Sequence, residues 1–263
     1  MENYHEITYT LSNHTAHICL NRPSKKNALT TRMILELTDA FKQSNKDPEV
    51  KLVLLEGMGS AFCSGLDLEE LKVISTKSTK ENIADAEQLA GLFNALYTHS
   101  KLTVSKIQGV AFAGGCGLAT LCDIAVASEE DAKFCYSETK IGFVPALVAV
   151  FLLRRTRNAG IREMLLRANV VSASEAQKLG LIAHSVSNEH IHSFVQQLCA
   201  ELLVNTSSEA ISLTKKLIRS VESLDLDEAI QYAIMINSLS RTTDDLKKGI
   251  QSFLNKEKLN WAL

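Results

Sequence analysis

Strand-like and helix-like patterns alternate along most of this chain. Ile7 to Leu11 and Ala16 to Leu20 are predicted to form two short strands around a turn at Asn13 and His14, as in a hairpin. These strands and "KLVLLEG" are followed by segments whose apolar residues recur at helical spacing, for example residues 80–100. After about residue 188 only the helical pattern remains. Alternation of this kind is typical of α/β proteins, because helices must cover the faces of the sheet. The sequence therefore predicts an α/β core over residues 1–187 and a helical segment over residues 188–263.

Two predicted helices begin with capping signals. Ser172 and Glu175 form an S-x-x-E box, and Gly180 follows where that helix should end. Asp67 and Glu70 have the same spacing before another helix, so we expect a reciprocal capping box there as well.

Charge and apolar content exclude several classes of function. The net charge is −2 over 263 residues, which offers no broad attraction to nucleic acid or to an acidic membrane. The longest apolar run, Ile141 to Leu153, contains a glycine and a proline and is too short to span a bilayer. The first ten residues lack the basic-then-apolar pattern of a secretion signal. We therefore expect a cytoplasmic protein with neither a membrane nor a nucleic acid as its partner.

The cysteines and histidines indicate no metal site. The six cysteines lie mostly in apolar segments and form no C-x-x-C pair, which is typical of reduced core residues. The seven histidines have no ligand spacing on a helix, and the usual motifs for dinucleotides, phosphates and zinc are absent from the sequence. We expect no bound metal and no permanently bound cofactor.

Two glycine-containing turns share one layout, in which a strand passes through small residues into a helix. They are "FCSGLDL", around Leu66, and "AFAGGCG", around Gly114. The first N–H groups of a helix have no partner inside it and carry the positive end of its dipole. If the two turns meet, their N–H groups could hold one negatively charged oxygen, as in an oxyanion hole. Each turn by itself is more often an ordinary connection between a strand and a helix.

A candidate acid or base lies in "KFCYSETKIG". If this segment is a strand, Phe134, Tyr136 and Glu138 point to the same face. Aromatic neighbours would then raise the pKa of the Glu138 carboxyl by desolvation, which suits it to proton transfer. The alternative is a solvated glutamate at the end of a strand, paired with Lys140.

Five motifs occur in order between about residues 5 and 190: "NRPSKKNAL", "GSAFCSGLDLEEL", "GVAFAGGCGLATLCDIAVA", "FCYSETKIGFVP" and "SASEAQKLGLI". Together they resemble the crotonase family, also called the enoyl-CoA hydratase/isomerase family. The resemblance implies a crotonase spiral of ββα repeats whose C-terminal helices build a homotrimer, often stacked as a hexamer. It also implies an acyl-CoA substrate, so that coenzyme A enters only as part of the thioester.

The resemblance also implies roles for individual residues. By motif position, the N–H groups of Leu66 and Gly114 would hold the thioester oxygen as it becomes an enolate, and Glu138 would transfer protons. The residues implied along the path of the coenzyme are Lys25, Lys26, Ala28, Ser64, Asp67 and Leu68. The two lysines could meet its phosphates, or they could belong to a solvated basic loop.

One carboxylate of the two-glutamate hydratases is missing from this chain. Those relatives carry one glutamate where this chain has Gly117 and a second at the position of Glu138. Within the family, a single glutamate is found in some 3,2-enoyl-CoA isomerases and in bacterial hydratases that resemble methylglutaconyl-CoA hydratase. The stretch "SETKIGFVPA" resembles the second group. We therefore expect free volume beside Gly117 for a branched acyl chain, in a pocket that includes Gly115 and Pro145.

Several interpretations of the function stay open. Hydration of a 2-enoyl-CoA is the leading interpretation, because "SETKIGFVPA" resembles the single-glutamate hydratases. One water could relay protons through Glu138 in such a reaction. An isomerase would use Glu138 alone to move a proton between two carbons. A third interpretation is an acyl-CoA-binding protein without efficient turnover, against which a desolvated glutamate argues. RNA binding, known in one branch of the family, is disfavoured by the near-neutral charge. Arg154 and Arg155 are candidates to meet a second carboxylate on a branched substrate, or they form a solvated helix end.

Overall fold

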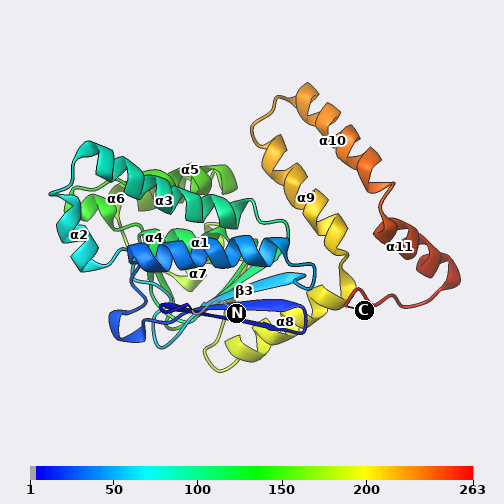
Figure 1. The fold of residues 1–263 in the computed structure, drawn as a ribbon, viewed down its shortest axis with the longest axis horizontal. Coiled ribbons are helices and arrows are strands. Elements are labelled where there is room, and N and C mark those ends of the chain that lie inside the picture. Colours follow the sequence, from blue (N-terminus) through cyan, green and yellow to red (C-terminus); the bar gives the residue numbers. More distant parts are fainter. Residues whose placement is uncertain (1–3, 263) are drawn as a thin grey trace.

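The computed structural model describes residues 4–262, which form two sheets with helices packed around them (Figure 1). The strands are β1 (Ile7–Ser12), β2 (Thr15–Leu20), β3 (Leu52–Gly57), β4 (Leu102–Ile107), β5 (Ala111–Phe112), β6 (Ile124–Ser128), β7 (Lys133–Cys135), β8 (Val171–Ser172) and β9 (His184–Val186). The helices are α1 (Thr31–Lys46), α2 (Leu68–Ile74), α3 (Thr79–Tyr97), α4 (Gly114–Leu121), α5 (Ala146–Arg155), α6 (Ala159–Arg167), α7 (Ala173–Lys178), α8 (Ile191–Asn205), α9 (Ser208–Val221), α10 (Leu226–Ser240) and α11 (Asp244–Asn255). Two short 3₁₀ helices are η1 (Pro23–Lys25) and η2 (Glu138–Ile141). The predicted α/β fold class is confirmed.

The strands divide between a main sheet and a small one. The main sheet has the order β1-β2-β3-β4-β6-β9, and the small sheet has the order β5-β7-β8. β1 and β2 form the predicted antiparallel hairpin, with Ile7 opposite Leu20, and the other neighbours in the main sheet run parallel. The hairpin turn at Asn13 and His14 has positive φ at both residues, which matches the right-handed twist of the flanking strands.

Helices cover both faces of the main sheet. The larger apolar core lies on the face covered by α1 and α3, where Phe41 and Phe93 are fully buried. On the other face, Ile191 and Val195 of α8 pack against Val104 of the sheet. Figure 1 shows α8 on the opposite side of the sheet from α1 and α3. The site-bearing turns therefore stand on a sheet that is buried on both faces.

The strand predicted before the second glycine turn is divided into β4 and β5, which belong to different sheets. The break falls at Gly109, where an added Cβ would lie 1.9 Å from the carbonyl oxygen of Ser60. Two backbones therefore touch at this point, and only glycine permits the contact. The chain leaves the main sheet here, and β5 pairs with β7 instead.

The two capping signals have different outcomes. Ser172 and Glu175 form the predicted reciprocal box, and Gly180 has the positive φ expected after a helix. Asp67 caps α2 by accepting a hydrogen bond from Glu69 N. The predicted box at Asp67 is wrong, because the carboxylate of Glu70 accepts instead from Thr31 N, at the start of α1.

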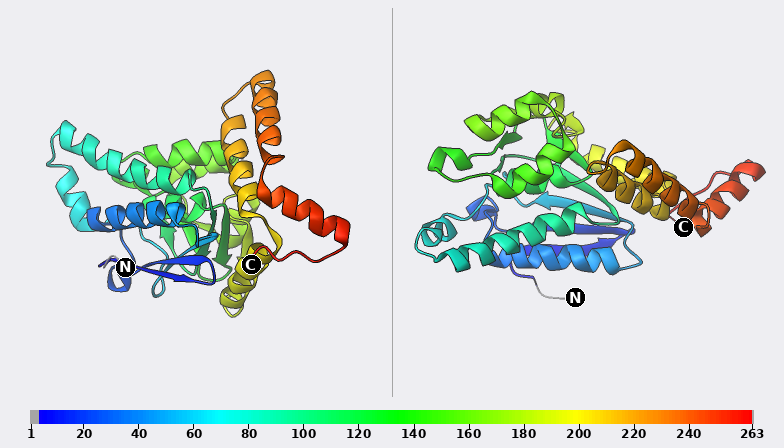
Figure 2. Two further views of the ribbon diagram at one scale, coloured as in Figure 1. Left: turned by 45° about the vertical axis from the view of Figure 1, so that its right-hand side comes forward. Right: turned by 90° about the horizontal axis from the view of Figure 1, so that it is seen from above.

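Helices α9, α10 and α11 project from the body in every view, and we call residues 208–255 the C-terminal arm (Figures 1 and 2). The arm leaves many large apolar side chains exposed, including Ile250, Phe253 and Leu254 of α11. The chain then returns to the body, where Trp261 N donates to Val204 O over 2.9 Å. Among the described residues, no helix is both long and apolar enough to cross a membrane.

Candidate active site

The two glycine turns lie side by side. Cys63 and Ala111 form a short parallel bridge, and Phe112 N donates to Cys63 O over 2.9 Å. Gly65 has a φ of +95°, and a Cβ added there would come within 3.0 Å of the Ala113 Cβ. The fold therefore brings together the two turns that the oxyanion-hole hypothesis requires to meet.

Leu66 and Gly114 each carry an unpaired backbone N–H at this contact. Within residues 4–262, neither N–H group has a hydrogen-bond acceptor. Leu66 forms an isolated parallel bridge with Leu29, in which Leu29 N donates to Gly65 O and Asp67 N donates to Leu29 O, each over 2.8 Å. The Leu66 N–H takes no part in this bridge, whereas Gly114 opens α4, where a first-turn N–H has no partner inside the helix.

The backbone is strained directly before Gly114. Ala113 has a φ of +49° and a ψ of −125°, a conformation that costs a residue with a side chain on the order of 1–3 kcal/mol. The strain is held by two hydrogen bonds: Ala113 N donates to Cys135 O over 2.7 Å, and Gly117 N donates to Ala113 O over 3.1 Å. This conformation turns the chain sharply from β5 into α4, with the Gly114 N–H at the corner.

Glu138 lies at the start of η2 and not in a strand. β7 ends at Cys135, so the predicted strand alternation through Tyr136 to Glu138 is wrong. The expected desolvation is nevertheless confirmed, because burial raises the pKa of the Glu138 carboxyl. Its Oε2 is buried without a hydrogen-bond partner in the described residues, and no ion pair with Lys140 is formed there. A buried, unsatisfied carboxylate oxygen is unusual and indicates a place for another molecule.

Glu138 lies close to the first turn of α4. Burial, assisted by the negative charge of Glu138, raises the pKa of the Cys116 thiol to about 12. The link between them is β7, which pairs with β5 through Phe112 and Cys135. Ala113 N, directly before Gly114, donates to Cys135 O over 2.7 Å, so the segment that carries Glu138 is joined to the turn that carries Gly114.

Comparison with known proteins agrees with this geometry. Residues 10–262 match the family described as "Enoyl-CoA hydratase/isomerase". The chain belongs to this family. A candidate enoyl-CoA hydratase of Thermus thermophilus is 37% identical over 92% of this chain and 95% of its own length. The peroxisomal Delta(3,5)-Delta(2,4)-dienoyl-CoA isomerase of Arabidopsis thaliana is 30% identical over 94% of this chain and 92% of its own.

Solved structures of the family share the fold. The crystal structure of an enoyl-CoA hydratase from Shewanella pealeana has a TM-score of 0.92, with 28% identity over 98% of this chain and 96% of its own. The family resemblance seen in the five motifs is therefore confirmed, and with it the crotonase-type fold. This chain is an enzyme of the enoyl-CoA hydratase/isomerase family.

The free volume expected beside Gly117 is absent. A Cβ added to Gly117 would lie 2.5 Å from Val148 Cγ1 and 3.3 Å from the ring of Phe93. Val148 of α5 and Phe93 of α3 therefore occupy the space into which a side chain at position 117 would extend. The expectation of room for a branched acyl group at this point is wrong, because α5 has packed onto the bare glycine.

Gly115 and Pro145, the other residues predicted to line the acyl pocket, have structural roles of their own. A Cβ at Gly115 would lie 2.4 Å from Cys63 O, so its missing side chain lets the two turns touch. Pro145 is buried and precedes the first residue of α5. Contact of either residue with an acyl chain stays a prediction.

The loop predicted to line the coenzyme path is a tight turn. Lys25 and Lys26 are exposed, and Lys26 and Asn27 have φ values of +51° and +53°. Ser64 N donates to Lys26 O over 3.1 Å, which joins this loop to the first glycine turn. The side chain of Leu68 is exposed beside it. Within residues 4–262, no group of three His, Cys, Asp or Glu side chains could hold a metal ion.

Asn27 is a structural residue of this loop that the sequence analysis missed. Its buried amide donates to Met58 O and Ala61 O, each over 2.9 Å, and its oxygen accepts from Arg22 N. Asparagine tolerates the left-handed conformation better than most residues, so its position after two lysines was an available signal.

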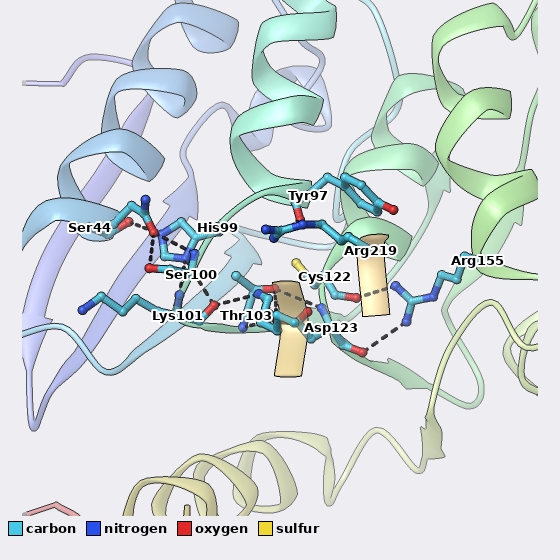
Figure 3. A network of polar contacts seen from close by, with 12 residues as sticks. Ser44, Tyr97, His99, Ser100, Lys101, Thr103, Cys122, Asp123, Arg155 and Arg219 are labelled. Carbon is cyan, nitrogen blue, oxygen red and sulfur yellow. Dashed lines mark hydrogen bonds and ion pairs between the residues drawn. The ribbon is translucent and has the colours of Figure 1, made fainter. Parts of the chain in front are cut away.

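The guanidinium of Arg155 binds backbone carbonyl groups of the protein. Figure 3 shows its guanidinium at the carboxyl end of α4, beside Cys122 and Asp123. Its Nη1 donates to Thr120 O over 2.5 Å and to Cys122 O over 2.6 Å, and its Nη2 donates to Asp123 O over 3.2 Å. The expected contact with a branched substrate is therefore wrong for Arg155, which stabilises the negative end of the helix dipole. Arg154 is exposed.

Proposed function

We propose that this enzyme adds water to a 2-enoyl-CoA, with Glu138 as the only acid and base. The observation that carries the proposal is the buried, unpartnered Oε2 of Glu138 near two unpaired backbone N–H groups. Members of the enoyl-CoA hydratase/isomerase family act on CoA thioesters, which supply the carbonyl oxygen that such donors would hold. A binding protein without turnover would have no use for a desolvated carboxylate.

The proposed reaction balances around one carboxylate. Glu138 takes a proton from water, and the water oxygen forms a bond to C3 of the substrate as the C2–C3 π electrons move toward the carbonyl. The N–H groups of Leu66 and Gly114 stabilise the enolate oxygen, where the charge develops. Glu138 then returns its proton to C2, which restores the carboxylate.

A second candidate is isomerisation of a 3-enoyl-CoA. It is favoured by the single carboxylate and by the 30% identity with a dienoyl-CoA isomerase. Glu138 would take a proton from C2 and return it to C4, with no water consumed. The two reactions need the same donors and differ in whether a water molecule is held beside Glu138.

We propose that the acyl group of the substrate is a 2-enoyl group. The filled space at Gly117 removes the argument for a bulky group at that point. The proposal of a branched acid, such as 3-methylglutaconyl-CoA, now depends on the stretch "SETKIGFVPA" alone. The residues proposed along the coenzyme are those of the loop from Lys25 to Ala28, with Ser64, Asp67 and Leu68.

The deciding experiment compares three substrates on the parent protein and on Glu138→Gln. Crotonyl-CoA, a 3-enoyl-CoA and 3-methylglutaconyl-CoA are each followed by thioester absorbance. Hydration of an enoyl-CoA that is lost in Glu138→Gln supports the proposal. Turnover of the 3-enoyl-CoA without hydration establishes the isomerase, and no turnover of any substrate contradicts both.

We also propose that residues 188–263 serve assembly into a homotrimer or hexamer and closure of the site. The exposed apolar side chains of the C-terminal arm support this, because a monomer would leave them in water. α8 is different from the arm, since it already covers one face of the main sheet.

A further inference from the structure

Arg22 joins three segments that are distant in the chain. Its Nη1 donates to Ala28 O over 2.6 Å and to the Asp67 carboxylate over 2.9 Å. Its Nε lies 3.3 Å from the carboxylate of Glu6. Its side chain is only 19% exposed, so these contacts are largely shielded from water.

The contacts of Arg22 lie on both sides of the bridge that carries Leu66. Ala28 directly precedes Leu29, and Asp67 directly follows Leu66, while Leu29 and Leu66 are the bridged pair. This bridge is isolated, and its two backbone hydrogen bonds are joined by one more between the same segments, from Ser64 N to Lys26 O. Nη1 of Arg22 adds a side-chain tie across this short pairing, at the end that carries Leu66.

Asp67 is held firmly enough to transmit this restraint. One of its carboxylate oxygens accepts from Glu69 N over 3.0 Å, and the other accepts from Arg22. These hydrogen bonds, that from Glu69 N foremost, hold the pKa of the Asp67 carboxyl below its usual range. Asp67 is consequently a fixed point immediately after Leu66.

We propose that Arg22 is a positioning residue that orients the Leu66 N–H toward the substrate oxygen. The proposal rests on the proposed function, in which Leu66 is one of the two oxyanion donors. A backbone donor has no side chain through which it can be fixed, and Gly65 before it is conformationally free. Displacing a catalytic group by about 1 Å can cost on the order of 100-fold in rate, so the tie between Ala28 and Asp67 bears on turnover. A lysine at position 22 cannot take over all of these contacts, because a single ammonium group lacks the guanidinium fork that reaches several acceptors.

The test uses Arg22→Met, Arg22→Lys and the control Lys106→Met in the full chain. Lys106 also forms a shielded ion pair, with Glu56 of the main sheet, and its side chain is 16% exposed. The measurements are kcat and KM with crotonyl-CoA, and the absorbance red shift of bound cinnamoyl-CoA. That shift reports polarisation of the thioester carbonyl, which a purely structural role of Arg22 would not change.

We expect Arg22→Met to lower kcat by about 100-fold, with a smaller rise in KM and a reduced red shift. Arg22→Lys should fall between this variant and the parent. Lys106→Met should keep kcat within about threefold of the parent and keep the full shift, because the Lys106–Glu56 pair shares no partner with Arg22 or with the Leu29–Leu66 bridge. If Arg22→Met does not fold, Arg22→Lys alone carries the test through its red shift.

Two results overturn the assignment and are distinguishable. A full red shift in the Arg22 variants, with kcat unchanged or with only KM raised, would show that Arg22 serves coenzyme binding or stability alone. No red shift in the parent protein would instead contradict the oxyanion hole, and both the proposed function and the role of Arg22 would fall.

Discussion

The ammonium group of Lys215 forms a buried ion pair with the carboxylate of Asp123. Lys215 belongs to α9 of the C-terminal arm, whereas Asp123, labelled in Figure 3, follows α4. The amino end of α4 carries Gly114. The same carboxylate accepts from Thr103 N and Thr103 Oγ1, each over 2.8 Å, and Lys215 also donates to Lys101 O over 2.8 Å. The arm is thus fastened to the body at the end of the helix that opens the candidate site.

Lys215→Met should destabilise the protein strongly. Removing one partner of a fully buried pair costs about 3–5 kcal/mol. The Asp123 side chain is 27% exposed and keeps its hydrogen bonds from Thr103, so we expect a loss near the lower end of that range. Lys215→Arg keeps the charge and should recover most of the loss. Denaturant unfolding measures the change, with Lys247→Met as the control. Lys247 pairs with Asp244 in solvent, and that pair contributes about 1 kcal/mol at most. Equal stability of the two methionine variants would contradict the importance of the buried pair.

Glu138→Gln should lower kcat by about 100- to 10,000-fold, because the amide can neither accept nor return the proton. Binding of coenzyme A should stay nearly unchanged, since the substitution removes little volume. The matched control is Glu163→Gln, whose carboxylate pairs with Arg167 on the surface of α6. Steady-state kinetics and calorimetric binding make the comparison. Activity of Glu138→Gln within about threefold of the parent would remove Glu138 from the mechanism.

The pH profile of the parent enzyme should show the raised pKa of Glu138. The carboxylate must be ionised to take a proton from water, so kcat/KM should fall as the pH falls through this pKa. Because burial raises the pKa, the fall should begin above the ordinary glutamate value of about 4.3. An acidic limb at or below that value would show that another group controls the rate.

The same shift has a consequence for stability. A carboxyl whose pKa is raised by folding stabilises the folded state below its unfolded pKa, and this stabilisation is lost as the pH rises through the folded pKa. Glu138→Gln is neutral at every pH, so its melting temperature should exceed that of the parent at pH 8 and approach it at low pH. Thermal unfolding at both pH values tests this. A lower melting temperature of the variant at pH 8 would contradict the desolvated state of Glu138.

Gly117→Glu should destabilise the protein and should not by itself raise hydration of crotonyl-CoA. The new Cβ would overlap Val148 Cγ1, and overpacking of this kind costs about 1–3 kcal/mol. Combining it with Val148→Ala removes that methyl group, so the double variant should regain stability relative to Gly117→Glu. Melting temperatures and crotonyl-CoA turnover of the parent, both single variants and the double variant make the measurement. A Gly117→Glu protein as stable as the parent would show that α5 moves freely away from α4.

Assembly can be tested on the last helix of the arm. We expect light scattering to give a trimer or hexamer, and Phe253→Asp to weaken it, because Phe253 is 82% exposed in the single chain. Gln251→Asp, on the same helix, is the control. A parent protein that stays at 28.9 kDa at micromolar concentration would contradict the proposed assembly.

Local patterns in the sequence were sufficient for several elements. The β1–β2 hairpin, the Ser172 box and the two glycine turns each depend on residues close together in the chain, so spacing alone predicts them. The order of the five motifs also predicted that the two glycine turns meet, which no single motif indicates. The role of Glu138 was predicted from the motif order, and its backbone leaves the strand before it.

Long-range packing accounts for what the sequence did not reveal. Val148 fills the space at Gly117 because α5 folds back over α4, and no spacing rule relates these two residues. Glu70 accepts from Thr31 N across 39 positions, so the spacing of Asp67 and Glu70 suggested a reciprocal box that does not form. Arg155 was expected near a substrate carboxylate. Its place at the end of an apolar helix does not reveal that the carboxyl end of α4 lies beside it.

The ion pair between Asp123 and Lys215 also sets an order of events during synthesis. The two residues are 92 positions apart, and ribosomes add about 5–20 residues per second, so Lys215 is made roughly 5–18 seconds after Asp123. Leu66, Gly114 and Glu138 are all made before α9. A nascent chain can therefore gather its catalytic half while the carboxylate of Asp123 is still hydrated. The ion pair that fastens the arm to the body can form only after α9 has been made.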